Sequence, residues 1–483
     1  MSAPAAGQAF LAVFACSRIL VSAAAVDDTL ALGRKALQNE GVTIAWKLSQ
    51  KALTEAPESA AAHEFTGEVL FRRGDFAQAE GEFQRASKLD SNFALAWWGL
   101  ARIAKCTSRR KTASQNILRA HELDPKDLRI SHDWAMSLRG QQHVDALQSY
   151  LSLLDPVRDA DQLRDLRQYI LLYKALNGRK IMVLASPYEK AAIPLAKFIS
   201  HTTHMRAFGL EAIVNGAKLR LVMDTGASGI VIQRRAAERA GVVRLADASF
   251  RGIGNNAKRP GGYHGIADRV RIGDVEIRDA LIDVVDRDFI TEDGLIGTNV
   301  FSEFLVTLNF AAGQLQLDPL PGYHAGEDEL RDGEIPPGMP SFKRVFQFGH
   351  MLLLPTRVSG SRDVLFLIDT GSARTLISYD MAAEVSKLNR DDRLHLSGIN
   401  GRVADVYQTG DLFLEFAGFR QKSLGMTAFD MWDHSRNLGT EVSGLFGLPL
   451  LEMFTLAIDY RDGLVNFDYQ EQKGTLPPRG IPK

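Results

Sequence analysis

The sequence predicts a multidomain chain in which an all-α region of helical repeats is followed by an all-β region made of two similar lobes. Two observations support this fold class. In the first third of the chain, glycine and proline are sparse and apolar residues recur every three or four positions, as is typical of helices. After about Arg179, glycine becomes frequent, strand-like runs appear, and one ordered set of motifs occurs twice.

The composition favours a globular protein with a full core and excludes some partners. The chain has 483 residues, of which 45% are hydrophobic and 24% are charged, and this length is enough for about three domains. A net charge of −1 gives no basic surface for nucleic acid or an anionic membrane. The two cysteines, Cys16 and Cys106, are too few for a disulfide framework, and Cys106 is expected to be a packed helix residue.

The segment 1–25 is predicted to be a signal segment. It is poor in acidic residues, apolar, and ends in the small-residue run SAAA, which is similar to a cleavage site. We therefore expect a periplasmic or secreted protein. The first ten residues contain no Lys or Arg, and Arg18 interrupts the apolar stretch, so a cytoplasmic protein with a helical or disordered start stays open. The run that ends in Cys16 also resembles a lipoprotein signal. No other stretch approaches the roughly 20 apolar residues of a membrane span.

Residues 26–178 are predicted to form a helical repeat domain. Turn signals begin at Ala56, Asp90 and Asp124, with spacings of 90 − 56 = 34 and 124 − 90 = 34. Small residues stand in register where two helices must approach closely, and they are Gly33, Gly67, Ala101, Ala45, Ala79, Ala113, Ala52, Ala86 and Ala120. The alternative is a plain helical bundle with coincidental spacing.

This pattern resembles the tetratricopeptide repeat, which is a helix-turn-helix unit of 34 residues. Three repeats fit at 26–57, 58–91 and 92–125, and a degenerate fourth fits at 126–156. A helix at 160–176 is expected to cap the stack. The resemblance implies a surface that binds a substrate or a partner protein.

The all-β region is predicted to contain a first lobe at 200–320, a linker at 321–341 rich in Pro, Gly and acidic residues, and a second lobe at 342–470. In each lobe a hairpin leads into Asp-Thr-Gly. A glycine-rich turn, paired strands, an apolar-apolar-Gly segment and a closing hairpin then follow in the same order. The Asp-to-Gly separations are similar, at 297 − 224 = 73 and 447 − 369 = 78 residues. This order indicates a duplicated unit.

The two Asp-Thr-Gly motifs point to one site with two carboxylates. A single motif is weak evidence, because Asp often forms a turn after a strand. A pair of carboxylates about 3 Å apart cannot both ionise, so they share a proton and supply both an acid and a base for the attack of water on a peptide. Asp224 and Asp369, which are 369 − 224 = 145 residues apart, are the candidates for these two roles.

The residues around these carboxyl groups suit the same chemistry. The hydroxyls of Thr225 and Thr370 are expected to cross-bond the two loops, and Gly226 and Gly371 leave space where the loops meet. Gly297 and Gly447 are expected to pack beneath the loops.

The next residue differs between the lobes, being Ala227 in the first and Ser372 in the second. We expect the Ser372 hydroxyl to donate to Asp369 and favour its ionised form, which leaves Asp224 as the protonated partner.

These motifs resemble the pepsin/retropepsin superfamily of aspartic proteases, with a layout similar to bacterial retropepsin-like proteins. The resemblance implies an all-β double-lobed acid-protease fold, an intramolecular pseudo-dimer, and an aspartic endopeptidase that uses Asp224 and Asp369 and no cofactor or metal. It also implies flap tips that bind substrate, at Gly252, Ile253, Gly254, Gly398, Ile399, Asn400 and Gly401.

Two alternatives to a single-chain protease remain. One is an inactive peptide-binding scaffold with the same fold, and the other is pairing of the lobes with lobes of a second chain. The pair His201 and His204 suggests a metal site only weakly, since no third ligand lies nearby in the sequence, and surface residues are the simpler interpretation.

Overall fold

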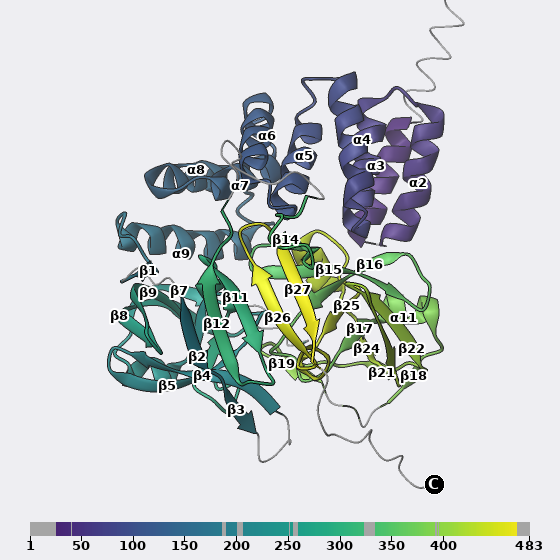
Figure 1. The fold of residues 1–483 in the computed structure, drawn as a ribbon. Helices are drawn as coiled ribbons and strands as arrows, with labels where there is room; N and C mark the ends of the chain where they lie inside the picture. Colours follow the sequence, from purple (N-terminus) through teal and green to yellow (C-terminus); the bar gives the residue numbers. More distant parts are fainter. Residues whose placement is uncertain are drawn as a thin grey trace, which may run out of the picture. The chain divides into compact units, whose positions relative to one another are not determined.

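A computed structural model describes most of the chain (Figure 1), namely residues 26–39, 41–185, 190–199, 206–250, 252–254, 259–322, 334–391, 394 and 396–470. The predicted signal segment, the central part of the predicted linker, and the pair His201 and His204 lie outside these residues. The chain divides into two compact units. The first contains Met1–Lys105, Arg110–Leu138 and Arg436–Glu441, and the second contains Cys106–Arg109, Arg139–Ser435 and Val442–Lys483.

Helices joined by short turns make up the first unit. A helix at 26–39 precedes α2 (Val42–Glu55), α3 (Ala60–Arg73), α4 (Phe76–Leu89), α5 (Ala94–Cys106), α6 (Arg110–Leu123) and α7 (Leu128–Ser137). The turns predicted near 56, 90 and 124 each fall between two of these helices. The tetratricopeptide-like succession of helices is therefore confirmed.

Small residues allow large ones to pack between neighbouring helices. A Cβ atom on Gly33 would lie 2.5 Å from the ring of Phe65, and one on Gly67 would lie 2.8 Å from the ring of Phe83. Both rings are fully buried. The glycines therefore stand where a larger residue would push the helices apart, as the register predicts.

Two further helices, α8 (Gly140–Leu153) and α9 (Ala160–Leu176), belong to the second unit. The bounds of α9 are those predicted from its sequence. A helix that only capped the repeats would pack against α8 alone. Instead, α9 packs against α8 and also against strand β7 (Val243–Ser249) of the first lobe. Helical periodicity identifies an apolar face but not the element that covers it.

The first lobe is a closed sheet of nine strands among the described residues. Besides β7, its strands are β1 (Val183–Leu184), β3 (Ala196–Ile199), β4 (Arg206–Val214), β5 (Ala217–Met223), β6 (Ile230–Gln233), β8 (Gly261–Ile272), β9 (Val275–Val285) and β10 (Gly294–Ile296). A short helix α10 (Arg234–Arg239) follows β6. The predicted hairpin joins β4 to β5, where Asn215 and Gly216 have φ angles of 46° and 92°. Strands β1 and β3 also belong to this sheet, although they precede residue 200, where the first lobe was predicted to begin.

A sheet of ten described strands forms the second lobe. The strands are β14 (Phe346–Phe348), β15 (Met351–Val358), β16 (Asp363–Ile368), β17 (Leu376–Ser378), β18 (Asn389–Arg390), β21 (Val406–Gln408), β22 (Leu412–Phe416), β23 (Phe419–Ser423), β24 (Thr427–Phe429) and β25 (Gly444–Phe446). Helices α11 (Tyr379–Val385), α12 (Trp432–Leu438) and α13 (Leu448–Leu451) lie between strands, and β19 (Ser397–Gly398) and β20 (Gly401–Arg402) form a separate hairpin.

A third sheet of six described strands joins the two lobes, in the order β13-β27-β26-β11-β12-β2. Its strands are β2 (Ala191–Pro194), β11 (Phe304–Asn309), β12 (Gln314–Pro319), β13 (Lys343–Arg344), β26 (Phe454–Asp459) and β27 (Leu464–Tyr469), and η1 (Thr298–Phe301) precedes β11. The closing hairpins of the two lobes meet in the antiparallel pair β11–β26. Met339, near the end of the predicted linker, and Phe342, at the start of the predicted second lobe, are buried in one cluster with Leu464.

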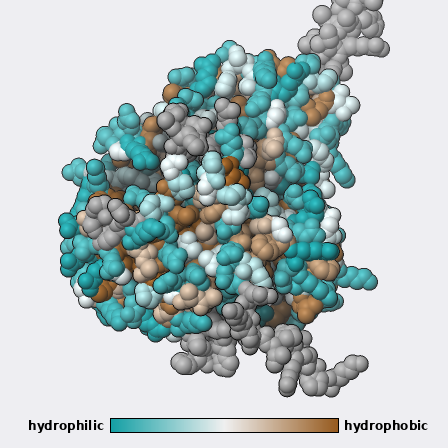
Figure 2. Space-filling model, viewed as in Figure 1, coloured by the Kyte–Doolittle hydropathy of each residue, from teal (hydrophilic) through white to brown (hydrophobic). Residues whose placement is uncertain are grey.

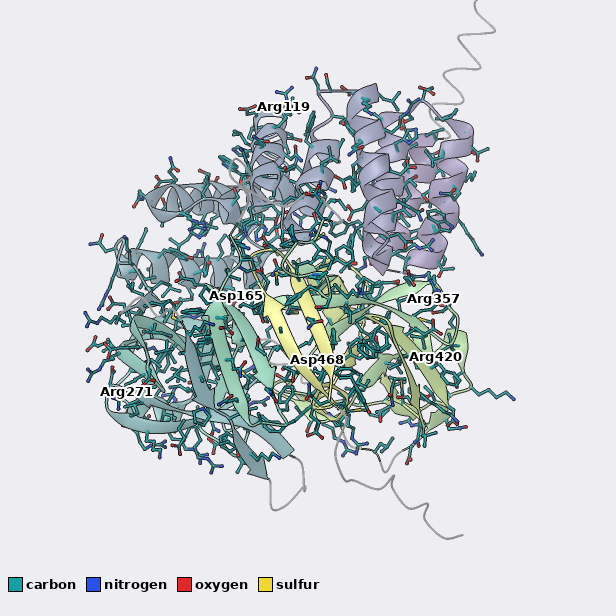
Figure 3. All side chains as sticks on the ribbon, viewed as in Figure 1. Arg119, Asp165, Arg271, Arg357, Arg420 and Asp468 are labelled. Atoms are coloured by element: carbon teal, nitrogen blue, oxygen red, sulfur yellow. The ribbon has the colours of Figure 1, made fainter. Side chains whose placement is uncertain are left out.

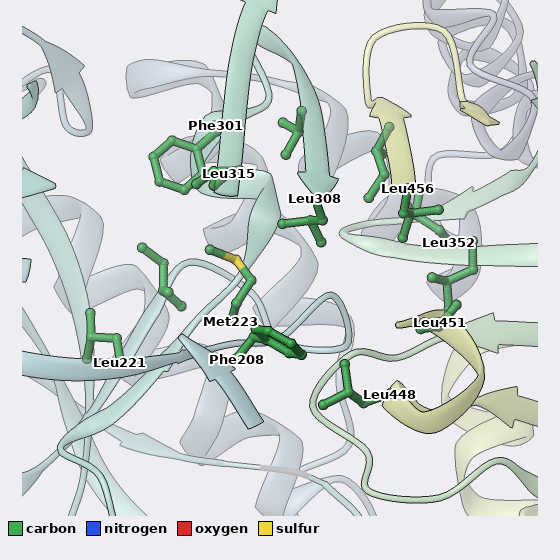
Figure 4. Packing of buried hydrophobic residues seen from close by; sticks show 14 of the residues in the cluster. Phe208, Leu221, Met223, Phe301, Leu308, Leu315, Leu352, Leu448, Leu451 and Leu456 are labelled. Carbon is green, nitrogen blue, oxygen red and sulfur yellow. The ribbon is translucent and has the colours of Figure 1, made fainter. Parts of the chain in front are cut away.

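One continuous apolar cluster fills both lobes and the sheet between them. Figure 4 shows Met223 and Phe208 from the first lobe and Leu352, Leu451 and Leu456 from the second within this cluster. The visible face is largely hydrophilic, with apolar residues interspersed (Figure 2). In the described part of the chain, no helix is long and apolar enough to cross a membrane.

Candidate active site

Asp224 follows the last residue of β5, where the strand is fixed on both sides. The neighbouring strand β10 runs parallel to β5 and places Ile296 beside Met223. The Asp224 amide donates to the Ile296 carbonyl at 3.0 Å. A Cβ atom on the next residue, Gly297, would lie 2.3 Å from the Ala227 carbonyl oxygen, so only glycine fits beneath the loop.

Asp369 has the same setting in the second lobe. It follows β16, its amide donates to the Phe446 carbonyl at 3.0 Å, and β25 runs parallel to β16. A Cβ atom on Gly447 would lie 2.2 Å from the Arg374 carbonyl oxygen. Both downstream glycines therefore pack beneath the loops as predicted, which makes the two settings structural repeats of one another.

The two loops are tied together by their threonines. The Thr225 amide donates to Thr370 Oγ1 at 3.0 Å, and the Thr370 amide donates to Thr225 Oγ1 at 3.0 Å. Each hydroxyl in turn donates across to a carbonyl of the other lobe, Thr225 to Ile368 at 2.7 Å and Thr370 to Met223 at 2.9 Å. Both side chains are buried. This reciprocal network fixes the distance between the loops.

The carboxyl groups face one another across the glycines. A Cβ atom on Gly371 would lie 2.4 Å from Asp224 Cγ, and one on Gly226 would lie 3.1 Å from Asp369 Cγ. Asp224 Oδ1 accepts from the Gly226 amide at 2.8 Å, and Asp369 Oδ1 accepts from the Gly371 amide at 3.0 Å. The structure thus brings the two predicted aspartates together in one site, with the predicted supporting residues around them.

Both lobes match known protease families in sequence. Residues 210–303 match the family described as "gag-polyprotein putative aspartyl protease", and residues 354–450 match the family described as aspartyl protease. The chain therefore carries two aspartyl protease domains. A comparison with curated proteins gives no match.

Solved structures of two kinds resemble parts of the chain. An aspartic proteinase from Irpex lacteus matches with 15% identity over 58% of this chain and 97% of that chain, with a TM-score of 0.37. A mutant O-GlcNAc transferase from Thermobaculum terrenum matches with 18% identity over 27% of this chain and 26% of that chain, with a TM-score of 0.25. Both TM-scores are low, so no argument rests on these two likenesses.

The two protease domains differ in the electrostatics of their aspartates. Burial raises the pKa of both carboxyl groups, and the pKa of Asp369 rises further because the charge of Asp224 and a hydrogen bond to it favour the protonated form. Asp369 is 8% exposed. The two carboxyl groups therefore titrate as one coupled pair in which a shared proton is favoured.

One expected contact beside Asp369 differs in the structure. The Ser372 hydroxyl donates to the Arg374 carbonyl at 2.9 Å instead of to Asp369. The contribution of Ser372 comes from its backbone amide, which donates to Asp369 Oδ1 at 3.0 Å. A serine that follows a tight turn can satisfy its hydroxyl locally, so the residue type alone did not predict its partner.

Sequence reasoning missed His350, which lies in the turn between β14 and β15. Its Nε2 atom is 3.0 Å from the Gly226 carbonyl oxygen, so a side chain of the second protease domain contacts the Asp-Thr-Gly loop of the first. Burial lowers the pKa of His350, although the Gly226 carbonyl and Asp224 act in the opposite direction. A single histidine in a turn belongs to no motif, so the sequence carried no signal for it.

The predicted flap tips form two hairpin ends that contact each other. The first tip, Gly252 to Gly254, lies between β7 and β8, and the second, Ile399 and Asn400, joins β19 to β20. The Asn400 amide donates to the Ile253 carbonyl at 2.9 Å, and Asn400 Nδ2 donates to the Gly254 carbonyl at 3.0 Å. Gly254 has a φ of 128°. A Cβ atom on Gly254 would lie 2.4 Å from the carbonyl carbon of Asn400, so a larger residue would not fit there.

The base of the first flap packs on α9. Leu172 and Leu176 of the helix are buried with Ala246 of β7 and Ile266 of β8. Asp165, labelled in Figure 3, accepts hydrogen bonds from flap residues, namely Ser249 Oγ at 3.1 Å and Arg259 Nη1 at 3.2 Å. Helix α9 therefore packs on the β7–β8 hairpin that carries the first predicted flap tip.

No group of three or more potential metal ligands occurs among the residues that the structure describes. The residues that surround the aspartates are backbone amides, threonines, glycines and His350, which suit a carboxylate pair and a water molecule.

Proposed function

We propose that the chain is an aspartic endopeptidase in which a water molecule, held between Asp224 and Asp369, attacks a peptide carbonyl. The reciprocal Thr225–Thr370 hydrogen bonds carry this proposal, because they hold two carboxyl groups together at the ends of equivalent strands. The ionised carboxyl group of the pair takes a proton from water, and the protonated one gives its proton to the carbonyl oxygen. The C–N bond of the tetrahedral intermediate then breaks as its nitrogen takes the proton that water gave to the pair, a hydroxyl of the intermediate returns a proton to the other carboxyl group, and no acyl-enzyme forms.

The proposed site is intramolecular. Both aspartates belong to one chain, and the pair β11–β26 joins the two protease domains in one sheet. This arrangement favours a pseudo-dimer within the chain over pairing with a second copy. If lobes of different chains formed the site, mixing Asp224→Asn and Asp369→Asn proteins would restore activity, and we expect no such restoration.

Cleavage of a denatured protein mixture across about pH 3–8 tests the proposal. We expect wild-type activity, and a loss of at least about 10³-fold in Asp224→Asn and in Asp369→Asn. Asp268→Asn, which changes an exposed aspartate in the same β-rich unit, is the matched control and should retain activity. Activity that survives either active-site substitution would contradict the paired-carboxylate mechanism.

A catalytically inactive peptide-binding scaffold is the alternative function. It predicts no cleavage by wild type at any pH, together with peptide binding that both substitutions leave intact. The intact Asp-Thr-Gly motifs and their shared hydrogen bonds favour the enzyme, because a scaffold has no need of two adjacent buried carboxyl groups, which are costly to keep.

We also propose that the helical repeats bind a protein substrate or partner. His132 and Met136 are exposed side chains of α7. They lie one repeat after Trp98 and Arg102, at 98 + 34 = 132 and 102 + 34 = 136. We expect His132→Ala with Met136→Ala to raise KM for a folded protein substrate and to leave kcat/KM for a short peptide unchanged. An equal effect on both substrates would contradict this role.

Export of the protein is a further proposal, supported only by the composition of the segment 1–25. Amino-terminal sequencing of the protein from separated periplasmic and cytoplasmic fractions tests it. A mature chain that starts near Val26 and is found in the periplasm is the expected result.

A further inference from the structure

The side chain of Tyr460 joins the second protease domain to the segment beneath the first Asp-Thr-Gly loop. Tyr460 directly follows β26, and its hydroxyl lies 2.5 Å from Thr298 Oγ1 in η1. Both side chains are buried, and the ring of Tyr460 belongs to the apolar cluster that fills the two lobes. Hydroxyl groups in apolar surroundings are costly without a partner, so this hydrogen bond is strongly favoured. Burial raises the pKa of Tyr460, so its hydroxyl keeps its hydrogen atom near neutral pH.

Thr298 belongs to the segment that holds the Asp224 loop from below. At the start of this segment, the Ile296 carbonyl accepts from the Asp224 amide at 3.0 Å. The Gly297 amide then donates to the Gly229 carbonyl, at the far end of the loop, at 2.8 Å. The loop is therefore fixed at both ends to the residues that precede Thr298, and a shift of Thr298 would move them.

The equivalent support in the second protease domain includes a backbone hydrogen bond that the first domain lacks. Leu448 is the counterpart of Thr298, since each directly follows the glycine beneath its loop. The Leu448 amide donates to the Ser372 carbonyl at 2.8 Å. Among the residues that the structure describes, the Thr298 amide makes no equivalent hydrogen bond to the Ala227 carbonyl.

The aromatic residue after the closing strand differs between the halves in the same sense. The counterpart of Tyr460 is Phe310, since each directly follows its strand of the pair β11–β26. Phe310 and Leu448 have no polar side-chain atom, and both are buried in the apolar cluster. The pair of hydroxyls, Tyr460 and Thr298, therefore occurs only in the half where the backbone hydrogen bond is missing.

We propose that Tyr460 is a positioning residue of the proposed active site, because its hydroxyl fixes Thr298 and with it the support of the Asp224 carboxyl group. The inference rests on the proposed aspartic protease function. Misplacement of a reacting group by a fraction of an ångström slows the reaction without removing contacts to the substrate. Loss of this hydrogen bond is therefore expected to lower kcat and to leave KM nearly unchanged.

Four substitutions test the role of the two hydroxyls. Tyr460→Phe removes one hydroxyl and keeps the ring, and Thr298→Val removes the other with little change in volume. We expect each to lower kcat by about tenfold to 100-fold and to change KM by less than about twofold. Thr298→Ser keeps a hydroxyl and should retain the wild-type kcat. Tyr469→Phe, at an exposed tyrosine of β27, is the matched control and should behave as wild type.

A double variant separates positioning from folding. Each single variant leaves one hydroxyl of the pair without the other and lowers the unfolding midpoint, whereas Tyr460→Phe combined with Thr298→Val removes both. We expect the double variant to recover the unfolding midpoint of wild type and to keep the low kcat of the single variants. A kcat that recovers together with the midpoint, or a wild-type kcat in Tyr460→Phe, would overturn the inference.

Hydrogen exchange of the full-length protein tests the same contact without catalysis. In Tyr460→Phe and in the double variant, we expect exchange to be at least about threefold faster in the peptide that covers residues 224–229, and unchanged around Asp369. Wild-type exchange in Tyr460→Phe, or an equal rise in both loops, would overturn the inference even in an active enzyme. The expected exchange in a protein without cleavage activity would support the contact and count against the proposed function alone.

Discussion

The two protease domains share their central geometry and differ in what surrounds it. Asp, Thr and Gly occupy equivalent positions, and each loop lies on a glycine that follows a parallel strand. The surroundings are unequal. The first flap has strands β7 and β8 of 7 and 12 residues and packs on α9, whereas β19 and β20 of the second flap have 2 residues each. The residues of the paired site are repeated, and the elements that support it are not.

This comparison teaches that a duplicated site need not be a symmetric one. Thr225 and Thr370 each supply one amide donor and one hydroxyl acceptor to the hydrogen bonds between them. A change of either threonine therefore breaks the same network. The proton distribution depends on burial and on neighbours that each half acquires separately. Asp224 has the His350 contact near it, and Asp369 has the lower exposure.

The largest expected difference between the halves concerns the glycines of the two motifs. A Cβ on Gly371 would meet the Asp224 carboxyl group at 2.4 to 2.6 Å, whereas one on Gly226 would be 3.1 Å or more from its nearest neighbours. We expect Gly371→Ala to lower kcat/KM by at least about 100-fold, because it displaces the Asp224 carboxyl group, and Gly226→Ala to lower it by about tenfold. Peptide cleavage assays check this, with folding monitored by calorimetry. Equal losses would contradict the inequality of the loops.

Equivalent strand ends offer a second asymmetry, in stability. β26 ends in Asp459, where the equivalent strand β11 ends in Asn309. Burial raises the pKa of Asp459 to about 6, and the charge of Asp462 adds to the rise. The protonated form is therefore favoured in the folded state. Its stabilisation is complete below the unfolded pKa near 4 and is lost as the pH rises through about 6.

Asp459→Asn places in β26 the residue type that Asn309 supplies in β11. It removes the contribution of Asp459 to the pH dependence of stability. We expect the unfolding free energy of the variant to fall less than that of wild type between about pH 4 and 7, by up to about 3 kcal/mol. Calorimetric unfolding midpoints across this range measure the difference. Asp468→Asn, at an exposed position of β27, is the control and should follow wild type. A variant that keeps the wild-type slope would rule out Asp459 as its source.

The contact between the flap tips tests whether the short flap depends on the long one. Asn400→Ala removes the side-chain hydrogen bond to the Gly254 carbonyl. We expect kcat/KM for a peptide to fall by about tenfold, which corresponds to the loss of one hydrogen bond. Asn389→Ala, an exposed position in the same lobe, is the matched control. Unchanged kinetics in Asn400→Ala would mean that the tips act independently.

The support from α9 is expected to have the smallest effect. Asp165→Ala removes the acceptor for Ser249 and Arg259, but these groups are partly exposed, and such pairs contribute little. We expect faster hydrogen exchange in β7 and a rise in KM of about twofold, with kcat unchanged. Asp161→Ala, at a more exposed position of the same helix, should leave β7 unaffected. Equal exchange in the two variants would remove α9 as a support for the flap.

Sequence reasoning succeeded where a physical requirement is local or repeated. The 34-residue register predicted the helices and their turns, and the paired Asp-Thr-Gly motifs with Gly297 and Gly447 predicted the loops and the glycines beneath them. These features follow from spacing along the chain, which the sequence displays directly.

It failed where a contact joins segments without a motif. The ring of His350 reaches a carbonyl 350 − 226 = 124 residues away, and α9 packs on a strand that its own periodicity does not specify. The predicted partner of the Ser372 hydroxyl was also wrong, because the hydroxyl donates to the Arg374 carbonyl and only the backbone amide of Ser372 donates to Asp369. Long-range neighbours and local competition both require coordinates.

The pairing of β11 with β26 within a single chain has a consequence for ligands. In a homodimer every substitution appears in both halves, and a ligand with two identical ends has two equivalent orientations. In the proposed intramolecular site each substitution enters one half only, so the two ends of such a ligand meet different neighbours. A pseudo-symmetric inhibitor should therefore bind in two orientations of unequal population, and His350→Leu should change their ratio.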